Sequence, residues 1–313
     1  MRSQKAFLFL IRSLACLLAM ATLAFNPARA QAPAAKVGVL LVNHGSRSAT
    51  WRAALLQTER NTREAMLRTN LIQGVKTAFM EYTEPSIATR MKEFDAEGFS
   101  DVVIVPVFLT VSSHTFDDIP TILGRKADPH SMQTLKIENI ERYTPKARTH
   151  LAPNLDFSAL LRENILRRAK ALSKDPAKEG LVLIAYGDAT YHKQWSDLME
   201  RTAAHVLSRT GMSTFSYGWA GHVAHYDPDH TTRAVEQVLR TRERAVVVPV
   251  LVAHDEMFQV KIIGGGIAQV PDHQKRVAYV PDAILPDPSV EAWVVATARE
   301  YAERARGGKA PGR

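Results

Sequence analysis

The sequence repeats one buried-strand pattern at two places about 140 residues apart. Val102–Leu109 reads Val-Val-Ile-Val-Pro-Val-Phe-Leu, and Ala245–Val252 reads Ala-Val-Val-Val-Pro-Val-Leu-Val. Continuous apolar runs of this kind, rich in β-branched residues, are typical of strands that a parallel sheet buries on both faces. The chain must therefore cover two such strands with helices on either side.

Two further matches have the same spacing. Leu181–Ala185 repeats the apolar run Val37–Val42, and Val277–Arg304 repeats the order of strand, Pro-rich turn and helix in Ile137–Lys170. Because strands alternate with helices, we expect parallel pairing. The predicted fold class is α/β, with two similar halves joined near Ser173–Gly180. Each half is expected to be a four-stranded parallel sheet flanked by helices, and the two halves to face a shared cleft.

The alternation also predicts the individual elements of the first half. Ser48 or Thr50 is expected to cap the first helix, because a hydroxyl can accept a hydrogen bond from the first turn. The expected extended segments are Val37–Val42, Gly74–Tyr82, Asp101–Leu109 and Thr134–Tyr143, and the expected helices are Trp51–Arg68, Ser86–Ala96, Thr115–Arg125 and Phe157–Leu172.

The first thirty residues have the pattern of a secretion signal. Arg2 and Lys5 form a basic start, Leu14–Phe25 is an apolar run, and Ala28–Ala30 reads Ala-Arg-Ala before Gln31. A basic segment, a short apolar segment and small residues at the exit together predict cleavage after Ala30. We therefore expect an exported, periplasmic protein.

This segment also bears on domains, membrane association and sulfur chemistry. Arg12 leaves its apolar run short of the roughly 20 residues that a membrane span needs, so no stable membrane anchor is expected. Cys16 is the only cysteine. Cleavage after Ala30 would therefore exclude thiolate metal ligands, a cysteine nucleophile and disulfide bonds. The predicted organisation is a signal peptide at 1–30, an N-terminal domain at 31–175 and a C-terminal domain at 176–313.

Charge argues against a nucleic-acid partner. Lys and Arg number 40 against 32 Asp and Glu, and four of the basic residues lie in the signal segment. The small surplus that is left is no basic patch for nucleic acid, although it suits a polyanionic small molecule.

Polar side chains follow each of the first three predicted strands. Asn43–Arg47 reads Asn-His-Gly-Ser-Arg, Glu81 and Glu84 close the second strand, and His114 follows the third. Ligands of parallel sheets bind beyond the carboxyl ends of the strands. Two imidazoles and a carboxylate at that edge would suit a metal site with open positions. Each piece also has an ordinary alternative, since a loop His often only forms hydrogen bonds and Glu84 can begin the next helix.

These residues belong to three segments that resemble a known family. The segments Val39–Arg47, Ala78–Ile87 and Val105–Pro120 look like the CbiX-type sirohydrochlorin cobaltochelatases, which are class II chelatases of cobalamin and sirohaem synthesis. The resemblance covers residues 37 to about 170 well and the second half more loosely. It implies two chelatase-like halves and a tetrapyrrole substrate.

The resemblance also implies roles for single residues. His44 and His114 correspond to the metal ligands of the family. Glu81, with Glu84 as a near alternative, corresponds to its acidic position, which we expect to be catalytic. No cofactor is expected to stay bound, because Co²⁺, Ni²⁺ or Fe²⁺ is a substrate that neutral imidazoles can hold and release. For the tetrapyrrole carboxylates we expect contacts from Ser46, Arg47, Arg52 and Ser113, at and near the N–H groups that open the first helix.

The second half departs from the family pattern. Tyr186 replaces the first His, and Met257 stands in the register of His114, because His254 follows its Pro by five residues instead of eight. His222, His225 and Asp227 lie nearby in the sequence but out of pattern. We therefore expect the active site in the first half.

The predicted function is that of a lyase, a metal chelatase that inserts cobalt, or nickel or iron, into sirohydrochlorin or a related tetrapyrrole. Two alternatives stay open at this point. One is a periplasmic metal-binding receptor that serves a transporter, and the other is a non-catalytic protein that binds a metal or haem. The sequence leaves homo-oligomer formation open.

Overall fold

The computed structural model describes residues 35–109, 112–154 and 159–307. The predicted signal peptide lies outside these residues. Within the described ranges, no helix has the length and apolar character required to cross a bilayer.

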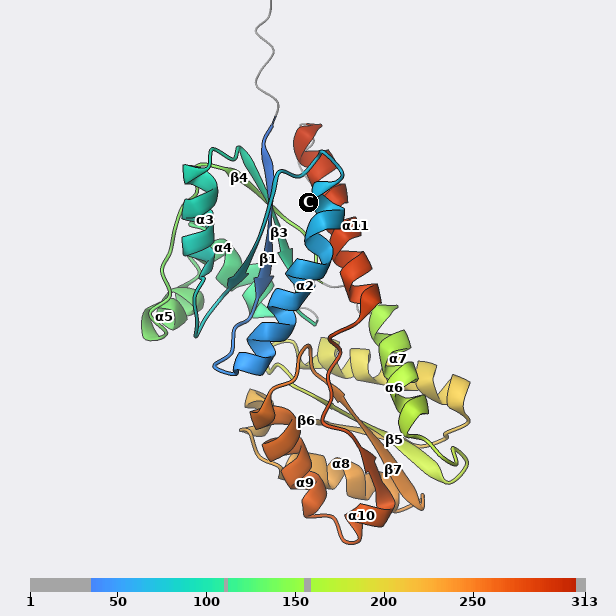
Figure 1. Cartoon of the computed structure of the whole chain (residues 1–313). Helices are drawn as coiled ribbons and strands as arrows, with labels where there is room; N and C mark the ends of the chain where they lie inside the picture. Colours follow the sequence, from blue (N-terminus) through green and yellow to red (C-terminus); the bar gives the residue numbers. More distant parts are fainter. Residues whose placement is uncertain (1–34, 110–111, 155–158, 308–313) are drawn as a thin grey trace, which may run out of the picture. The chain divides into compact units, whose positions relative to one another are not determined.

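The first half forms a four-stranded parallel sheet with the order β2-β1-β3-β4 (Figure 1). Its two central strands are buried along their whole length, as the apolar runs predict. The elements are β1 (Val37–Asn43), α2 (Ala49–Leu67), β2 (Gly74–Phe79), α3 (Ile87–Ala96), β3 (Asp101–Pro106), the π-helical turn η1 (His114–Asp118), α4 (Ile119–Ile122), α5 (Pro129–Ile137), β4 (Arg148–Leu151) and α6 (Leu160–Leu172).

The second half repeats this arrangement, with the parallel order β6-β5-β7-β8. The elements are β5 (Glu179–Ala185), α7 (His192–Thr210), β6 (Phe215–Trp219), the short 3-10 helix η2 (His222–Ala224), α8 (Asp229–Leu239), β7 (Arg244–Val250), the π-helical segment η3 (Glu256–Gly264), α9 (Gly265–Ala268), α10 (His273–Arg276), β8 (Val277–Tyr279) and α11 (Pro288–Arg306). The prediction of two similar α/β halves with four parallel strands each is confirmed.

One predicted element of the first half is wrong. Thr134–Tyr143 is not extended, because α5 runs through its first four residues. Asp128 caps this helix by accepting a hydrogen bond from Ser131 N at 2.9 Å, and Pro129 is pre-shaped for the first helical position. The fourth strand is Arg148–Leu151 instead.

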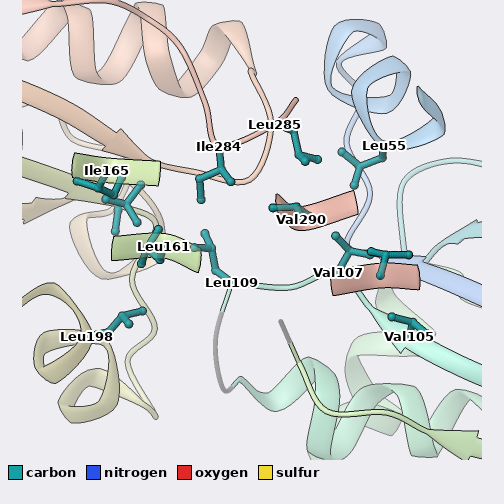
Figure 2. Packing of buried hydrophobic residues seen from close by; sticks show 14 of the residues in the cluster. Leu55, Val105, Val107, Leu109, Leu161, Ile165, Leu198, Ile284, Leu285 and Val290 are labelled. Carbon is teal, nitrogen blue, oxygen red and sulfur yellow. The ribbon is translucent and has the colours of Figure 1, made fainter. Parts of the chain in front are cut away.

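The halves exchange their last helices. The C-terminal helix α11 packs against α2, β1 and β3 of the first half, and α6 packs against α7 and β7 of the second (Figure 1). One cluster of buried apolar residues consequently runs through both halves (Figure 2). It includes Leu55 of α2, Val107 just after β3, Val290 of α11, Leu161 of α6 and Leu198 of α7. The predicted boundary near residue 175 thus separates the sheets, while the helices cross it.

Candidate functional site

His44 follows the last residue of β1 and is held beside the end of β2. The backbone turns at Gly45, where φ is +114° and a Cβ would meet the Glu81 carbonyl oxygen at 2.0 Å. Only glycine allows so close an approach in this conformation. The turn brings His44 Nε2 to 2.7 Å from Glu81 Oε1, with the Glu81 side chain only 8% exposed.

Both ring nitrogens of His44 face an acceptor. Nδ1 lies 3.0 Å from the Gly45 carbonyl oxygen and Nε2 faces the Glu81 carboxylate. Burial lowers the pKa of an imidazole, but the hydrogen bond to Glu81, its charge and the Gly45 carbonyl outweigh burial and hold the pKa of His44 above its ordinary 6.5. His44 is therefore poised to carry a proton on the nitrogen that faces Glu81.

His114 opens η1 at the end of the loop after β3. Its Nδ1 donates to Asp118 Oδ2 at 2.7 Å, one turn further along the same segment. Although burial raises the pKa of Asp118, the hydrogen bond from His114 and other donors bring it below its usual value. A carboxylate at Nδ1 fixes the tautomer that leaves a lone pair on Nε2, as in many metal-binding histidines.

The two imidazoles are neighbours. The ring centroids of His44 and His114 lie 4.8 Å apart, with the ring planes at 76°. Among the described residues, no group of three or more His, Cys, Asp or Glu is arranged as a ready metal site. The geometry is that of a paired imidazole set backed by two carboxylates.

A cavity of about 890 Å³ lies against this pair. Its volume is at the upper end of the roughly 300–1,000 Å³ that small-molecule sites occupy. Both halves of the sequence contribute to its wall, while Glu81 sits behind His44 and is not part of it. The lining includes His44, Arg47, Tyr82, Phe108, Ser113 and His114 of the first half, and Tyr186, Asp188, His222, Tyr226, Met257 and Phe258 of the second.

Of the residues predicted to bind substrate, Ser46, Arg47 and Ser113 line this cavity, whereas Arg52 is not among the lining residues. Arg47 is exposed, and its guanidinium carbon lies 5.5 Å from the Tyr82 ring centre. Ser113 is half-buried and forms no capping hydrogen bond. The Ser46 hydroxyl already donates to Asp255 Oδ2 at 2.7 Å, and Arg52 donates to the Ser46 carbonyl oxygen at 2.7 Å.

Two other candidates lie elsewhere. The Glu84 carboxylate accepts a hydrogen bond from the N–H of Ser86 just before α3, so of the two acids only Glu81 meets His44. His254 Nδ1 lies 2.7 Å from the Pro281 carbonyl oxygen and is not among the residues lining the cavity.

Sequence reasoning missed part of the site. Asp118 was visible as an acid four residues after His114, a spacing that puts two helical side chains on one face. Tyr82 and Tyr226 in loops and Phe258 in η3 left no such signal, because their contacts depend on the tertiary fold.

Comparison with known proteins agrees with this geometry. A family model described as CbiX matches residues 38–172. The sirohydrochlorin cobaltochelatase of Methanococcoides burtonii is 33% identical over 96 residues, which are 31% of this chain and 69% of that protein. The sirohydrochlorin cobaltochelatase of Methanocaldococcus jannaschii is 35% identical over 92 residues, 29% of this chain and 62% of that protein. The match therefore spans less than two thirds of the latter's length.

Solved structures share the fold of the whole described chain. The sirohydrochlorin chelatase SirB from Bacillus subtilis subspecies spizizenii, in complex with cobalt, has a TM-score of 0.61 at 16% identity and covers 87% of this chain and 97% of its own. DR2241 from Deinococcus radiodurans, a multi-domain protein similar to chelatases, has a TM-score of 0.56 at 21% identity and covers 84% and 54%. The relative from Methanococcoides burtonii, covered to 69% of its length, and the family model lead to one conclusion: the chain belongs to the CbiX family.

Proposed function

We propose that this protein is a metal chelatase that inserts a divalent ion into sirohydrochlorin or a related tetrapyrrole. The observation that carries the proposal is the imidazole pair of His44 and His114, backed by Glu81 and Asp118, at a cavity of macrocycle size. Membership of the CbiX family and relatives named sirohydrochlorin cobaltochelatase support it.

In this proposal the incoming ion replaces a proton. In the metal-free protein, a proton on His44 Nε2 satisfies the Glu81 carboxylate. The ion would displace that proton to solvent, and His44 Nε2, His114 Nε2 and the Glu81 carboxylate would hold it. Imidazole and carboxylate donors bind cobalt, nickel and ferrous iron without enclosing them, so positions stay open for pyrrole nitrogens.

The same groups receive the protons that the macrocycle must lose. As the ion passes to the four ring nitrogens, two pyrrole N–H protons leave. One returns to His44 Nε2, where Glu81 stabilises it, and the other goes to His114 Nε2, whose charge Asp118 balances. His114 then releases its proton to solvent, which, with the proton displaced when the ion bound, accounts for the two protons that each insertion sets free.

We propose cobalt as the metal, because the relatives are named cobaltochelatases, with nickel and iron as the competitors to test. The experiment follows the visible spectrum of metal-free sirohydrochlorin mixed with the protein and each ion at pH 8. We expect cobalt insertion at least about tenfold faster than the spontaneous reaction in buffer, a lowering of the barrier by about 1.4 kcal/mol. Tight binding of metal or tetrapyrrole at the spontaneous rate would instead identify a non-catalytic binder.

A further inference from the structure

The second half carries aromatic residues where the first half carries its candidate ligands. β5 pairs with β6 in the same register as β1 with β2, and Gly221 N donates to the Tyr186 carbonyl oxygen just as Glu81 N donates to that of His44. Tyr186 therefore occupies the place of His44, and Gly221 that of Glu81. This half has kept the geometry of a site and lost the chemistry of metal binding.

Four rings of the second half contact one another in a closed circuit, which we call the aromatic platform: Tyr186, His222, Tyr226 and Phe258. The centroid distances around the circuit are 5.5, 5.2, 6.2 and 5.5 Å. The Tyr226 hydroxyl holds it together through contacts of 2.8 Å to His222 Nδ1 and 3.3 Å to the Tyr186 hydroxyl. All four residues line the cavity that also meets His44 and His114.

Two rings of the platform, His222 and Tyr226, are exposed to solvent, and Tyr186 and Phe258 are half-buried. Tyr226 is 36% exposed, and Met257 beside the platform and Tyr82 of the first half are 46% and 45% exposed. His225 and Tyr226 both have left-handed backbone angles, with φ of 50° and 59°. Exposed apolar surface and unfavourable backbone angles in one place are features that ligand sites share.

The charges around the cavity do not favour recognition of many carboxylates. Within the described residues, Arg47 is the only Lys or Arg of the lining. Four acids share that lining, namely Asp118, Glu138, Asp188 and Asp255. A polyanionic ligand would meet four carboxylates and a single guanidinium on this wall, whereas a flat ring would meet several aromatic side chains.

We propose that the aromatic platform is the seat of the macrocycle, and that the stacked ring face provides more of the binding affinity than carboxylate pairing does. The identification of the ligand as a tetrapyrrole rests on the proposed function. Aromatic faces bind flat π-systems by offset stacking, with affinity that tolerates changes at the ring periphery. The first half would then supply the metal chemistry and the second half the ring contact.

The first test measures binding of metal-free coproporphyrin by fluorescence titration of the full chain. Tyr226→Leu and Phe258→Leu should each raise the Kd about tenfold, as expected for the loss of one stacked ring. Tyr226→Phe keeps the ring and should stay within about threefold of wild type. Tyr301→Leu, on α11 and outside the lining, is the matched control. Leu variants that bind like wild type, with circular dichroism showing the fold intact, would overturn the proposal.

The second test compares porphyrins with eight, four and two carboxylates, namely uroporphyrin, coproporphyrin and mesoporphyrin. The platform predicts that uroporphyrin binds no more tightly than coproporphyrin and that salt weakens neither by more than about threefold. Tightest binding of uroporphyrin with a steep loss of affinity in salt would refute it. Both tests use metal-free rings, so they remain valid if the insertion assay fails. If insertion occurs but the Leu variants bind porphyrin like wild type, the platform proposal alone is refuted.

Discussion

At the scale of single residues, the site is organised around the His44 ring. The Gly45 carbonyl and the Glu81 carboxylate accept from opposite sides of the His44 ring, and only the protonated imidazole can donate to both. A metal ion must compete with that proton for Nε2. Metal affinity is thereby coupled to pH more steeply than an isolated histidine would make it.

This coupling gives a measurable pH dependence. Glu81 raises the pKa of His44 above 6.5. The association constant for cobalt should therefore have fallen to half of its high-pH value at a pH above 6.5, and should fall further as the pH drops. Glu81→Gln removes the charge that stabilises the proton, so its midpoint should move to lower pH. Cobalt titration by calorimetry from pH 5.5 to 8.5 measures both midpoints. Glu84→Gln is the control, because the Glu84 carboxylate accepts a hydrogen bond from Ser86 N and does not contact His44. Equal midpoints for wild type and Glu81→Gln would contradict this role of Glu81.

The sequence predicted these residues because strand ends are predictable. Once β1, β2 and β3 are recognised as parallel strands, His44, Glu81 and His114 must lie at one edge of the sheet. The hydrogen bond that raises the pKa of His44 was not predictable, because it depends on the turn at Gly45 and a distance of tenths of an ångström.

At the scale of elements, the apolar patterns predicted which helices exist but not which sheet each covers. The helices α6 and α11 are amphipathic, and an apolar stripe fits either sheet of a duplicated fold equally well. Specific polar contacts accompany the packing of α6 against the second half. Arg168 of α6 is 5% exposed, donates to the Pro249 carbonyl oxygen of β7 at 2.8 Å and pairs with Asp282.

Replacing that arginine should weaken the attachment of α6 to the second half. Arg168→Ala leaves the buried Pro249 carbonyl without its donor and Asp282 without its partner, so we expect a loss of roughly 3 kcal/mol in the free energy of unfolding. Its neighbour Arg167 is mostly exposed and pairs with Asp287 at 3.1 Å, so Arg167→Ala should lose less than about 1 kcal/mol. Urea unfolding at pH 7 measures both. Equal losses for the two variants would show that burial of Arg168 does not anchor the helix.

At the scale of the whole molecule, the two halves share a fold and differ in chemistry. Tyr186, Gly221 and Met257 stand where the first half has His44, Glu81 and His114. The repeat in the sequence predicted the shared fold. The residue differences between the two repeats predicted that only the first half carries the metal ligands. Tyr186 and Met257 line the same cavity as the His pair, whereas Gly221 is not among the lining residues. The expectation of a cleft shared by the halves could not say which side chains build its wall, since that depends on the tertiary fold.

The central claim is that metal insertion takes place at the His pair of the first half. The measurement that tests it most directly is the cobalt insertion rate of His44→Ala beside that of His254→Ala, at one pH and one metal concentration. His44→Ala should lose at least about 99% of the rate over background, because the pair keeps one imidazole and Glu81 loses its partner. His254→Ala should stay within about twofold of wild type, since its ring contacts the Pro281 carbonyl outside the cavity lining. A near-normal His44→Ala together with an inactive His254→Ala would place the reaction in the second half and contradict the account.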